Sequence, residues 1–421
     1  MSIDHSSDTR RMNSTSLPTT FLCLLASLPS LAAAADFPTF ETRVIDPMCG
    51  NICYAVTLAD VDGDGRQDIV AVTENRVLWY GQPEKPDGEW KKHVIIEDQS
   101  DRDNVCIAAH DIDGDGKVDF ALGAGWTKIG TLQWLTRGKS LDDKWSVHFI
   151  DKEVWLHRLR FADVLGKGKP QLVISPLNKT RGDGVRLTAY EIPVNPRSGR
   201  WPPTVLDATL NRMHNHWHID FDGNKSVDTL TASQEGVSII SRDGEKWSRL
   251  PLARGANGEK PEAQGAGEIK TGVFKNGKRL IATVEPMHGE TAVVYIGPPA
   301  LTADEDATKP AAWKRVLLDD KLKRGHAIWC ADLDGDGNDE VIVGHSDPGP
   351  GTIKGPGVYV YRCELPSEDK WTKHVLDDGG MATEDIAAAD LMGDGAIDIV
   401  AGGRNTHNIK LYVNRGAKRS P

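Results

Sequence analysis

The chain has 421 residues, a formal net charge of −11 at neutral pH and a pI near 5.6. The acidic balance and the absence of a basic run argue against a nucleic-acid partner. Helical patterns are almost absent, and one repeat array accounts for the length, so the sequence predicts a single domain after a short leader.

Residues 1–35 have the features of an export signal. Arg10 and Arg11 precede a short apolar run that ends in an alanine-rich cleavage site. A membrane anchor is the alternative, but the run is short and interrupted by prolines. We therefore expect a secreted or periplasmic protein with no membrane attachment after cleavage, and one domain over residues 36–421.

Four segments share a spacing of oxygen-bearing side chains that is typical of calcium-binding loops. Oxygens at positions 1, 3, 5 and 9 can surround a hard cation, and a glycine at position 6 allows the sharp turn. The flanking segments alternate as strands do, so each loop is the turn of a hairpin and not an EF-hand. The loop that starts at Asp220 is the weakest match. The predicted calcium ligands are Asp60, Asp62, Asp64 and Asp68, then Asp111, Asp113, Asp115 and Asp119, then Asp220, Asp222, Asn224 and Asp228, and finally Asp332, Asp334, Asp336 and Glu340.

The loop recurs in degenerate form at three further places, with a period typical of a β-propeller. Alternating strands that begin with tryptophan run in phase with it, and a third apolar strand lies between them. Each unit is therefore a four-stranded antiparallel sheet. Seven units predict an all-β, seven-bladed β-propeller with calcium loops in the blade turns. The first loop positions are residues 60, 111, 163, 220, 272, 332 and 390.

Only six outer strands begin with tryptophan. The seventh covers residues 40–45 at the front of the mature chain, whereas the last blade ends at Asn414 without an outer strand. We expect the N-terminal strand to complete that blade and to close the ring without an open edge.

The acidic loops, followed by strands such as residues 68–72, resemble the FG-GAP/VCBS repeat family of seven-bladed propellers over nearly all of the mature chain. The resemblance implies calcium in the blade turns. It does not select one function, because the family includes integrin-like adhesion heads, lectins and sugar lyases. At the level of the fold alone, the chain is similar to the propeller part of aldos-2-ulose dehydratase, without the cupin part of that enzyme.

A group of histidines shares one position in the inner strands, six residues before the first loop residue. This position lies at the upper mouth of the central channel, on the face opposite the calcium loops. We therefore expect three histidines and a glutamate to converge at the axis. The alternative is that the histidines are unrelated and bond carbonyl groups of the crossovers. The position is occupied by Tyr54, Val105, His157, His214, Ala266, His326 and Glu384.

Positions two and four residues further along the inner strands are largely apolar, as at Val56, Ile107 and Leu159. By simple alternation they share a sheet face with the mouth residues. His216 and His218 occupy these positions in the fourth blade, so we expect both to be buried and hydrogen-bonded.

The predicted mouth suits removal of an acidic proton beside a carbonyl or carboxylate group of a sugar. A histidine takes the proton, Arg158 or a divalent metal stabilises the enolate, and Tyr54 or a second histidine protonates the leaving oxygen. Trp126 stacks on the sugar ring. The predicted catalytic residues are His157, His214, His326, Glu384, Arg158 and Tyr54. The predicted substrate-binding residues are Trp126, Arg181, His288, His345, Arg404 and His407.

The sequence favours an exported, calcium-stabilised carbohydrate lyase or dehydratase that acts on a sugar or sugar-derived small molecule. Two alternatives stay open: a non-catalytic calcium-dependent carbohydrate-binding or adhesion module, and a metal-binding periplasmic protein without turnover. We expect structural calcium, zinc or another divalent metal at the histidines, and a monomer. A disulfide among Cys49, Cys53 and Cys106 is expected in an oxidising compartment.

Overall fold

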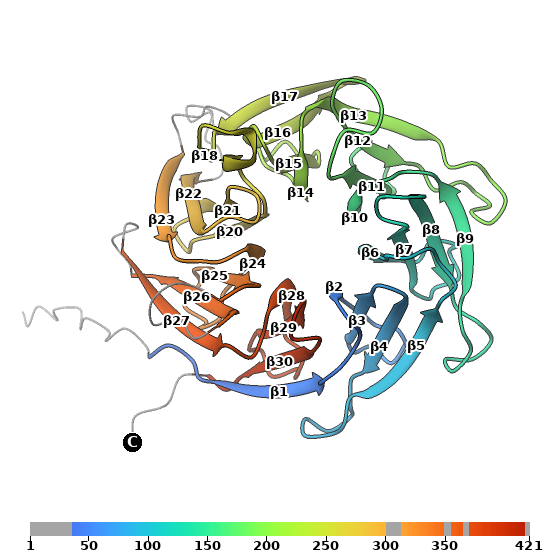
Figure 1. The fold of residues 1–421 in the computed structure, drawn as a ribbon, viewed down its shortest axis with the longest axis horizontal. Helices are drawn as coiled ribbons and strands as arrows, with labels where there is room; N and C mark the ends of the chain where they lie inside the picture. Colours follow the sequence, from blue (N-terminus) through green and yellow to red (C-terminus); the bar gives the residue numbers. More distant parts are fainter. Residues whose placement is uncertain (1–35, 300–312, 349–354, 365–369, 417–421) are drawn as a thin grey trace, which may run out of the picture. The chain divides into compact units, whose positions relative to one another are not determined.

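The computed structural model describes residues 36–299, 313–348, 355–364 and 370–416. The export signal expected over residues 1–35 lies outside them. In the described part, seven four-stranded antiparallel sheets surround a central axis, which is the seven-bladed β-propeller predicted from the sequence (Figure 1).

Each blade is a meander whose first strand lies nearest the axis (Figure 1). Blade 1 contains β2 (Cys53–Ala59), β3 (Asp68–Thr73), β4 (Arg76–Gly81) and β5 (Lys91–Glu97). Blade 2 contains β6 (Cys106–His110), β7 (Asp119–Ala124), β8 (Thr131–Thr136) and β9 (Ser146–Asp151). Blade 3 contains β10 (Leu156–Ala162), β11 (Gln171–Pro176), β12 (Val185–Tyr190) and β13 (Pro203–Leu210). Blade 4 contains β14 (Met213–Ile219), β15 (Asp228–Ser233), β16 (Gly236–Asp243) and β17 (Lys246–Ala253).

The remaining blades follow the same order. Blade 5 contains β20 (Ile269–Val273), β21 (Lys278–Glu285), β22 (Thr291–Pro299) and β23 (Lys314–Asp319). Blade 6 contains β24 (Gly325–Ala331), β25 (Glu340–His345), β26 (Gly357–Cys363) and β27 (Trp371–Asp378). Blade 7 contains β28 (Thr383–Ala389), β29 (Asp398–Gly403), β30 (Ile409–Asn414) and β1 (Phe40–Asp46). The crossover into blade 5 carries the small pair β18 (Ala256–Asn257) and β19 (Gln264–Gly265) around a 3₁₀ turn, Pro261–Ala263.

The first described strand and the last one share a sheet. β1 pairs antiparallel with β30, with Phe40 opposite Asn414 and Thr42 opposite Tyr412. The N-terminal strand therefore occupies the outer position of blade 7 and gives β30 a hydrogen-bonded neighbour on its outer side.

Hydrophobic side chains hold neighbouring blades together. In one cluster, Val70 and Val72 of blade 1 meet Phe120 and Leu122 of blade 2, and Trp145 at the start of the outer strand covers them. All five side chains are at most 2% exposed. This rigid packing leaves the two ends of the inner strands to carry polar groups.

Antiparallel order assigns those two ends to two faces. The turns between first and second strands carry the acidic loops, and we call this side the loop face. The turns between second and third strands, together with the crossovers between blades, lie at the opposite end, which we call the mouth face.

Five inner strands carry a β-bulge at the mouth face. In blade 3, Leu156 pairs with Pro176 and Arg158 pairs with Ser175, so His157 between them has no partner. An inserted residue shifts the alternation of side chains by one position. The same shift in blades 1, 4, 6 and 7 leaves Tyr54, His214, His326 and Glu384 unpaired.

The bulge overturns the simple alternation expected from the sequence. Below it, Val56 and Leu159 pack into hydrophobic clusters between blades and also border the central channel. Arg160, Trp217 and Lys270, from the alternate positions of the inner strands, line the same channel. Charged and aromatic side chains therefore line the channel below the mouth. Simple alternation counted from the mouth residues does not predict them.

The inner strand of blade 5 has no bulge, and its alignment differs from the one made on the sequence. Ile269 lies opposite Thr283, and the Gly267 N–H donates to the Val284 carbonyl at 2.7 Å. Gly267, and not Ala266, is thus equivalent to His214. The next residue, Glu268, is equivalent to Arg158 and is buried.

Candidate functional site

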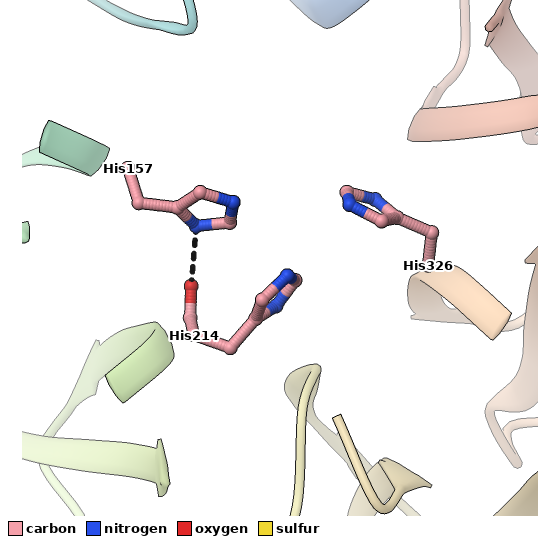
Figure 2. A group of neighbouring side chains, drawn as sticks. All are labelled: His157, His214 and His326. Carbon is pink, nitrogen blue, oxygen red and sulfur yellow. Dashed lines mark hydrogen bonds between the residues drawn. The ribbon is translucent and has the colours of Figure 1, made fainter. Parts of the chain in front are cut away.

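Three histidine side chains from three blades meet at the axis. His157 from β10, His214 from β14 and His326 from β24 point toward one another (Figure 2), and one ring nitrogen from each lies within 4.8 Å of the others. Their ring centroids are 4.3, 5.0 and 6.3 Å apart, and each residue is at most 5% exposed. The convergence expected from their shared strand position is present.

Each imidazole is anchored by a main-chain carbonyl of the following blade. His157 Nδ1 bonds the His214 carbonyl at 2.8 Å, His214 Nδ1 bonds the Gly267 carbonyl at 3.1 Å, and His326 Nδ1 bonds the Glu384 carbonyl at 2.6 Å. A carbonyl only accepts, so Nδ1 carries the hydrogen and Nε2 keeps its lone pair. The carbonyl bonds that were the alternative to convergence thus orient the converging rings, as they do in metal sites.

A fourth imidazole completes the group. His288, in the turn between β21 and β22, stands with its Nε2 2.8 Å from His214 Nε2, and its ring stacks on His326 at 4.6 Å. Its backbone φ of 56° is in the left-handed region, which is unusual for a histidine. Two ring nitrogens at this distance share a hydrogen or a cation.

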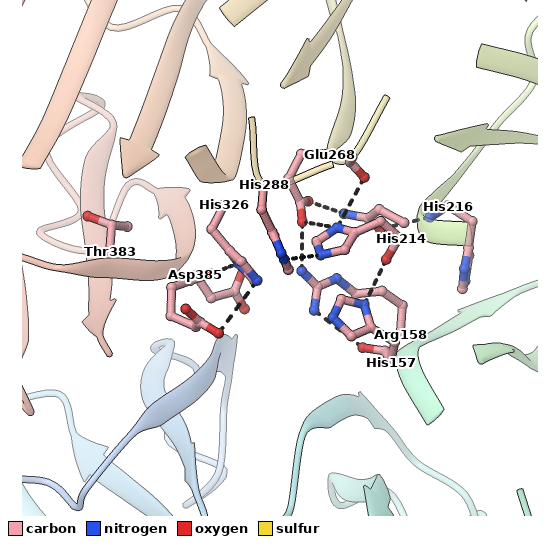
Figure 3. A network of polar contacts seen from close by, with 12 residues as sticks. His157, Arg158, His214, His216, Glu268, His288, His326, Thr383 and Asp385 are labelled. Atoms are coloured by element: carbon pink, nitrogen blue, oxygen red, sulfur yellow. Dashed lines mark hydrogen bonds and ion pairs between the residues drawn. The ribbon is translucent and has the colours of Figure 1, made fainter. Parts of the chain in front are cut away.

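Glu268 connects the imidazoles to an arginine below them (Figure 3). Its Oε1 lies 2.8 Å from His214 Nδ1 and 2.8 Å from Arg158 Nη2, and its Oε2 accepts from the Asn215 side chain. Burial opposes its ionisation, but Arg158 and then His214 hold the pKa of Glu268 well below its usual range. Glu268 is therefore a charged carboxylate that orients His214.

Glu384 is the second carboxylate at the mouth. Its Oε1 accepts from Arg404 at 2.6 Å and lies 3.5 Å from His326 Nε2. Its Oε2 is buried and has no hydrogen-bond partner among the described residues. Burial raises the pKa of Glu384, and the attraction of Arg404 offsets this only in part.

Burial also sets the protonation of the histidines. It lowers the pKa of His214 to about 4 and that of His326 to about 3, and it lowers the pKa of His157 well below its usual range. All three rings are therefore neutral near pH 7 and able to act as ligands or bases.

These groups surround a cavity of about 170 Å³ that opens on the mouth face. Its lining comes from bulged residues of the inner strands and from turns and crossovers of that face. The cavity is lined by Tyr54, Val105, Trp126, His157, Arg158, Leu177, His288, Arg324, His326, Glu384 and Arg404.

Most sequence-predicted site residues reach this cavity, but four do not line it. His214 contacts the other rings from below. Arg181 bonds the Lys152 carbonyl at the exposed rim of blade 3. His345 is buried at the end of β25, and His407 bonds the Asn51 carbonyl outside the cavity.

Of the two remaining histidines of β14, His216 is buried as predicted, whereas His218 is only half-buried. His216 Nδ1 lies 3.0 Å from the Ser175 hydroxyl, and His218 Nδ1 lies 3.0 Å from the Thr229 hydroxyl. The bulge above them turns both away from the three converging rings.

Sequence reasoning missed Glu268 and Arg324. Glu268 had a detectable signal, an acidic residue next to an apolar inner strand, but the weak loop of blade 5 misplaced it by one residue. Arg324 lies in a crossover, directly before β24, where no repeat aligns it.

The acidic loops have the geometry of cation sites. Three carboxylates of each loop offer oxygens within 4.8 Å of one another. Burial, and then the neighbouring carboxylates, raise the pKa of Asp119 to about 7 and of Glu340 to about 9. Asp113 Oδ1 is buried with no hydrogen-bond partner among the described residues. The groups are Asp60, Asp62 and Asp68; Asp111, Asp113 and Asp115; Asp220, Asp222 and Asp228; and Asp332, Asp334 and Asp336.

The other predicted calcium ligands lie in the same loops. Asp119 and Glu340 accept the N–H groups of Ile112 and Leu333 at 3.0 and 2.8 Å. Asp64 forms an ion pair with Arg66. Asn224 accepts from the Ser226 N–H at 2.7 Å.

The five cysteines among the described residues are free thiols, contrary to the expected disulfide. Cys106 packs with Leu156 of blade 3, whereas Cys49 and Cys53 pack with Val400 of blade 7. Cys106 therefore faces away from the other two. Within the described ranges, no helix is long and apolar enough to cross a membrane.

Comparisons with known proteins agree with the fold and with the resemblance seen in the repeats. Residues 129–298 match the family model of the aldos-2-ulose dehydratase β-propeller domain, and residues 60–122 match that of the FG-GAP-like repeat. The matched region includes His157, His214 and His288 but ends before His326.

The chain is 27% identical over 265 residues to the aldos-2-ulose dehydratase of Phanerodontia chrysosporium. The aligned part covers 59% of this chain and 29% of that protein. The chain is thus a β-propeller related to the propeller domain of that enzyme, and it spans less than a third of the relative's length.

Two solved structures align with the chain at low identity. BBS1N, crystallised in complex with ARL6DN, aligns with a TM-score of 0.52 and 12% identity over 91% of this chain and 98% of that chain. A lectin of Agrocybe aegerita aligns with a TM-score of 0.47 and 14% identity over 86% of this chain and 94% of that chain.

Proposed function

We propose that this protein is a carbohydrate lyase or dehydratase whose active site is the cavity at the mouth. The supporting observation is the convergence of His157, His214 and His326, each anchored through Nδ1, beside a cavity that also contains Glu384 and Arg404. Elimination beside a sugar carbonyl needs a base, a stabiliser of the enolate and an acid. The relative's name, aldos-2-ulose dehydratase, favours an oxidised sugar as substrate.

The three imidazoles fit a divalent metal such as zinc. They are neutral, their Nδ1 atoms are oriented by carbonyls, and three nitrogens with an open position are typical of catalytic zinc. Bound there, such an ion polarises a carbonyl oxygen.

The remaining groups take complementary roles in this proposal. Glu384 takes the proton, because its Oε2 has no hydrogen-bond partner among the described residues and burial raises its pKa. Arg404 and Arg324 stabilise the negative charge that develops on the substrate oxygen. Tyr54 donates to the leaving oxygen, since burial raises its pKa to about 12 and keeps it protonated.

The acidic loops fit structural calcium in this proposal, on the opposite face from the chemistry. A cluster of buried carboxylates with raised pKa values costs free energy unless a cation neutralises it. The leader over residues 1–35 supports export to a compartment where calcium is abundant.

The proposal is tested by incubating the purified mature chain with a panel of aldos-2-uloses and uronates and following the absorbance of the unsaturated product. Glu384→Gln should reduce the rate by about 10²–10⁴-fold because it removes the base. Arg181→Ala should not change the rate, since Arg181 lies outside the cavity. Saturable sugar binding without any turnover by the metal-loaded protein would instead support the non-catalytic carbohydrate-binding module.

A further inference from the structure

A second cavity, of about 350 Å³, lies in the channel below the mouth. We call it the lower chamber. Arg158 lines both it and the mouth cavity, but the three histidines do not line it. Its polar and aromatic lining consists chiefly of Arg158, Arg160, Trp217, Lys270, Trp329 and Asp385.

Lys270 is the least satisfied charge in this chamber. It is 5% exposed, and its ammonium lies 4.4 Å from the ring centre of Trp217 and 5.1 Å from that of Trp329. Among the described residues, no carboxylate forms an ion pair with it. The indole faces hold the ammonium in place, and none of the described residues offers its N–H donors a hydrogen-bond acceptor.

Arg160 is a second cation without a charged partner. Its Nε donates to the His216 carbonyl at 2.7 Å and its Nη2 donates to the Asn215 side-chain oxygen at 3.1 Å. Both acceptors are neutral. Its guanidinium lies 4.7 Å from the ring centre of Trp217, so one indole holds both cations.

The charges of the chamber do not balance. Arg158 and Glu268 form an ion pair at 2.8 Å and cancel. Asp385 accepts a backbone N–H from Val56 and is the one remaining carboxylate of the lining, against two cations. Burial, and then Arg160, lower the pKa of Lys270 to about 7, which shows how poorly the chamber tolerates this charge without a counter-ion.

We propose that the lower chamber binds a small organic or inorganic oxyanion, whose oxygens accept hydrogen bonds from Lys270 and Arg160. The shared chemistry is an anionic oxygen, from a carboxylate or a phosphate, on a molecule no larger than a monosaccharide acid. Such a ligand neutralises the excess positive charge and supplies the acceptors that Lys270 lacks. This site is independent of the function proposed for the mouth.

The test is isothermal titration of the full chain with glucuronate and, in a separate arm, with inorganic phosphate, at pH 6.5 in a chloride-free buffer. One equivalent of at least one of the two anions should bind, and the arm that binds identifies the source of the oxygens. Lys270→Met should weaken binding at least tenfold, because it removes the positive charge. The methionine side chain keeps the contact with the tryptophans, so packing is preserved. Lys246→Met, at an exposed lysine of β17, should leave binding unchanged.

Two results would overturn the assignment. One is absence of binding in both arms, or equal binding by a Lys270→Met variant that melts at or above the wild-type temperature. The other is loss of anion binding in His326→Ala, which would place the anion at the mouth. Retained binding in His326→Ala supports the lower chamber whether or not the mouth has lyase activity, so failure of one proposal does not imply failure of the other.

Discussion

The two faces of the propeller are built from the same hairpins but gather their polar residues in opposite ways. On the loop face, each cluster of carboxylates comes from one continuous segment, and the pattern repeats in four blades. On the mouth face, the three converging histidines come one each from blades 3, 4 and 6, so they meet only when the blades are assembled around the axis. The repeated sites are suited to stability, whereas the single assembled site is suited to chemistry.

Removal of a charged side chain from the assembled site should have the largest effect on stability. Glu268→Ala leaves Arg158 buried without its partner, so we expect the free energy of unfolding to fall by about 3–5 kcal/mol in urea denaturation. Glu290→Ala, whose ion pair with Lys323 is exposed, should cost less than about 1 kcal/mol. A similar small loss for both variants would mean that Glu268 is not the charged orienting group.

Removing one imidazole should affect metal binding by the histidines without affecting metal binding by the acidic loops. His326→Ala should weaken zinc binding about 100-fold, because it deletes one of three ligands, while calcium binding by the loops is unchanged. Titration with both metals measures this directly, with His407→Ala as the matched control outside the cavity. Equal zinc affinity in the wild type and His326→Ala would remove the metal site from the mouth.

A loop substitution should show the reverse behaviour. Asp113→Ala should lower stability by about 2 kcal/mol in saturating calcium, because an ion that binds only the native state stabilises it by mass action. The difference from wild type should shrink when calcium is chelated. Asp394→Ala, in the degenerate loop of blade 7, should not change the calcium dependence. Loss of turnover in Asp113→Ala without a loss of stability would contradict a purely structural role.

The smallest expected effect comes from the lower chamber. Lys270→Met should raise stability by about 1 kcal/mol near pH 6, because it removes a poorly paired buried charge. The pKa of Lys270 falls from 10.5 when unfolded to about 7 when folded. The cost of its charge is therefore fully present below pH 7 and declines as the pH rises toward 10.5. Thermal melts of both proteins at pH 6 and pH 9, without added anions, should show the gain shrinking at the higher pH.

The sequence predicted well the features that depend on residues within a single repeat. The acidic loops, the tryptophan-led strands and the shared position of three histidines lie within single repeats, so counting along the chain found the seven blades and the mouth. The bulges were not predictable, because an inserted residue such as His157 leaves no mark in the composition of its strand. The bulges shift the alternation of side chains by one position, so the residues that line the lower chamber could not be identified from the sequence.

Other features of the site depend on contacts between blades, and these were not predicted from the sequence. Glu268 was missed because blade 5 lacks both the bulge and a recognisable acidic loop, so its alignment slipped by one residue. Arg181 and His345 were placed near the substrate because their loops belong to the mouth face. Whether a loop side chain turns inward depends on tertiary packing, and both turn elsewhere.

Anomalous diffraction on crystals grown with both zinc and calcium tests the distinction between the two faces most directly. Data above and below the zinc edge should show one zinc peak, about 2.0–2.1 Å from ring nitrogens of His157, His214 and His326, and none in the acidic loops. Zinc confined to the acidic loops, or no zinc peak among these histidines, would contradict the account of the mouth as a metal-dependent active site.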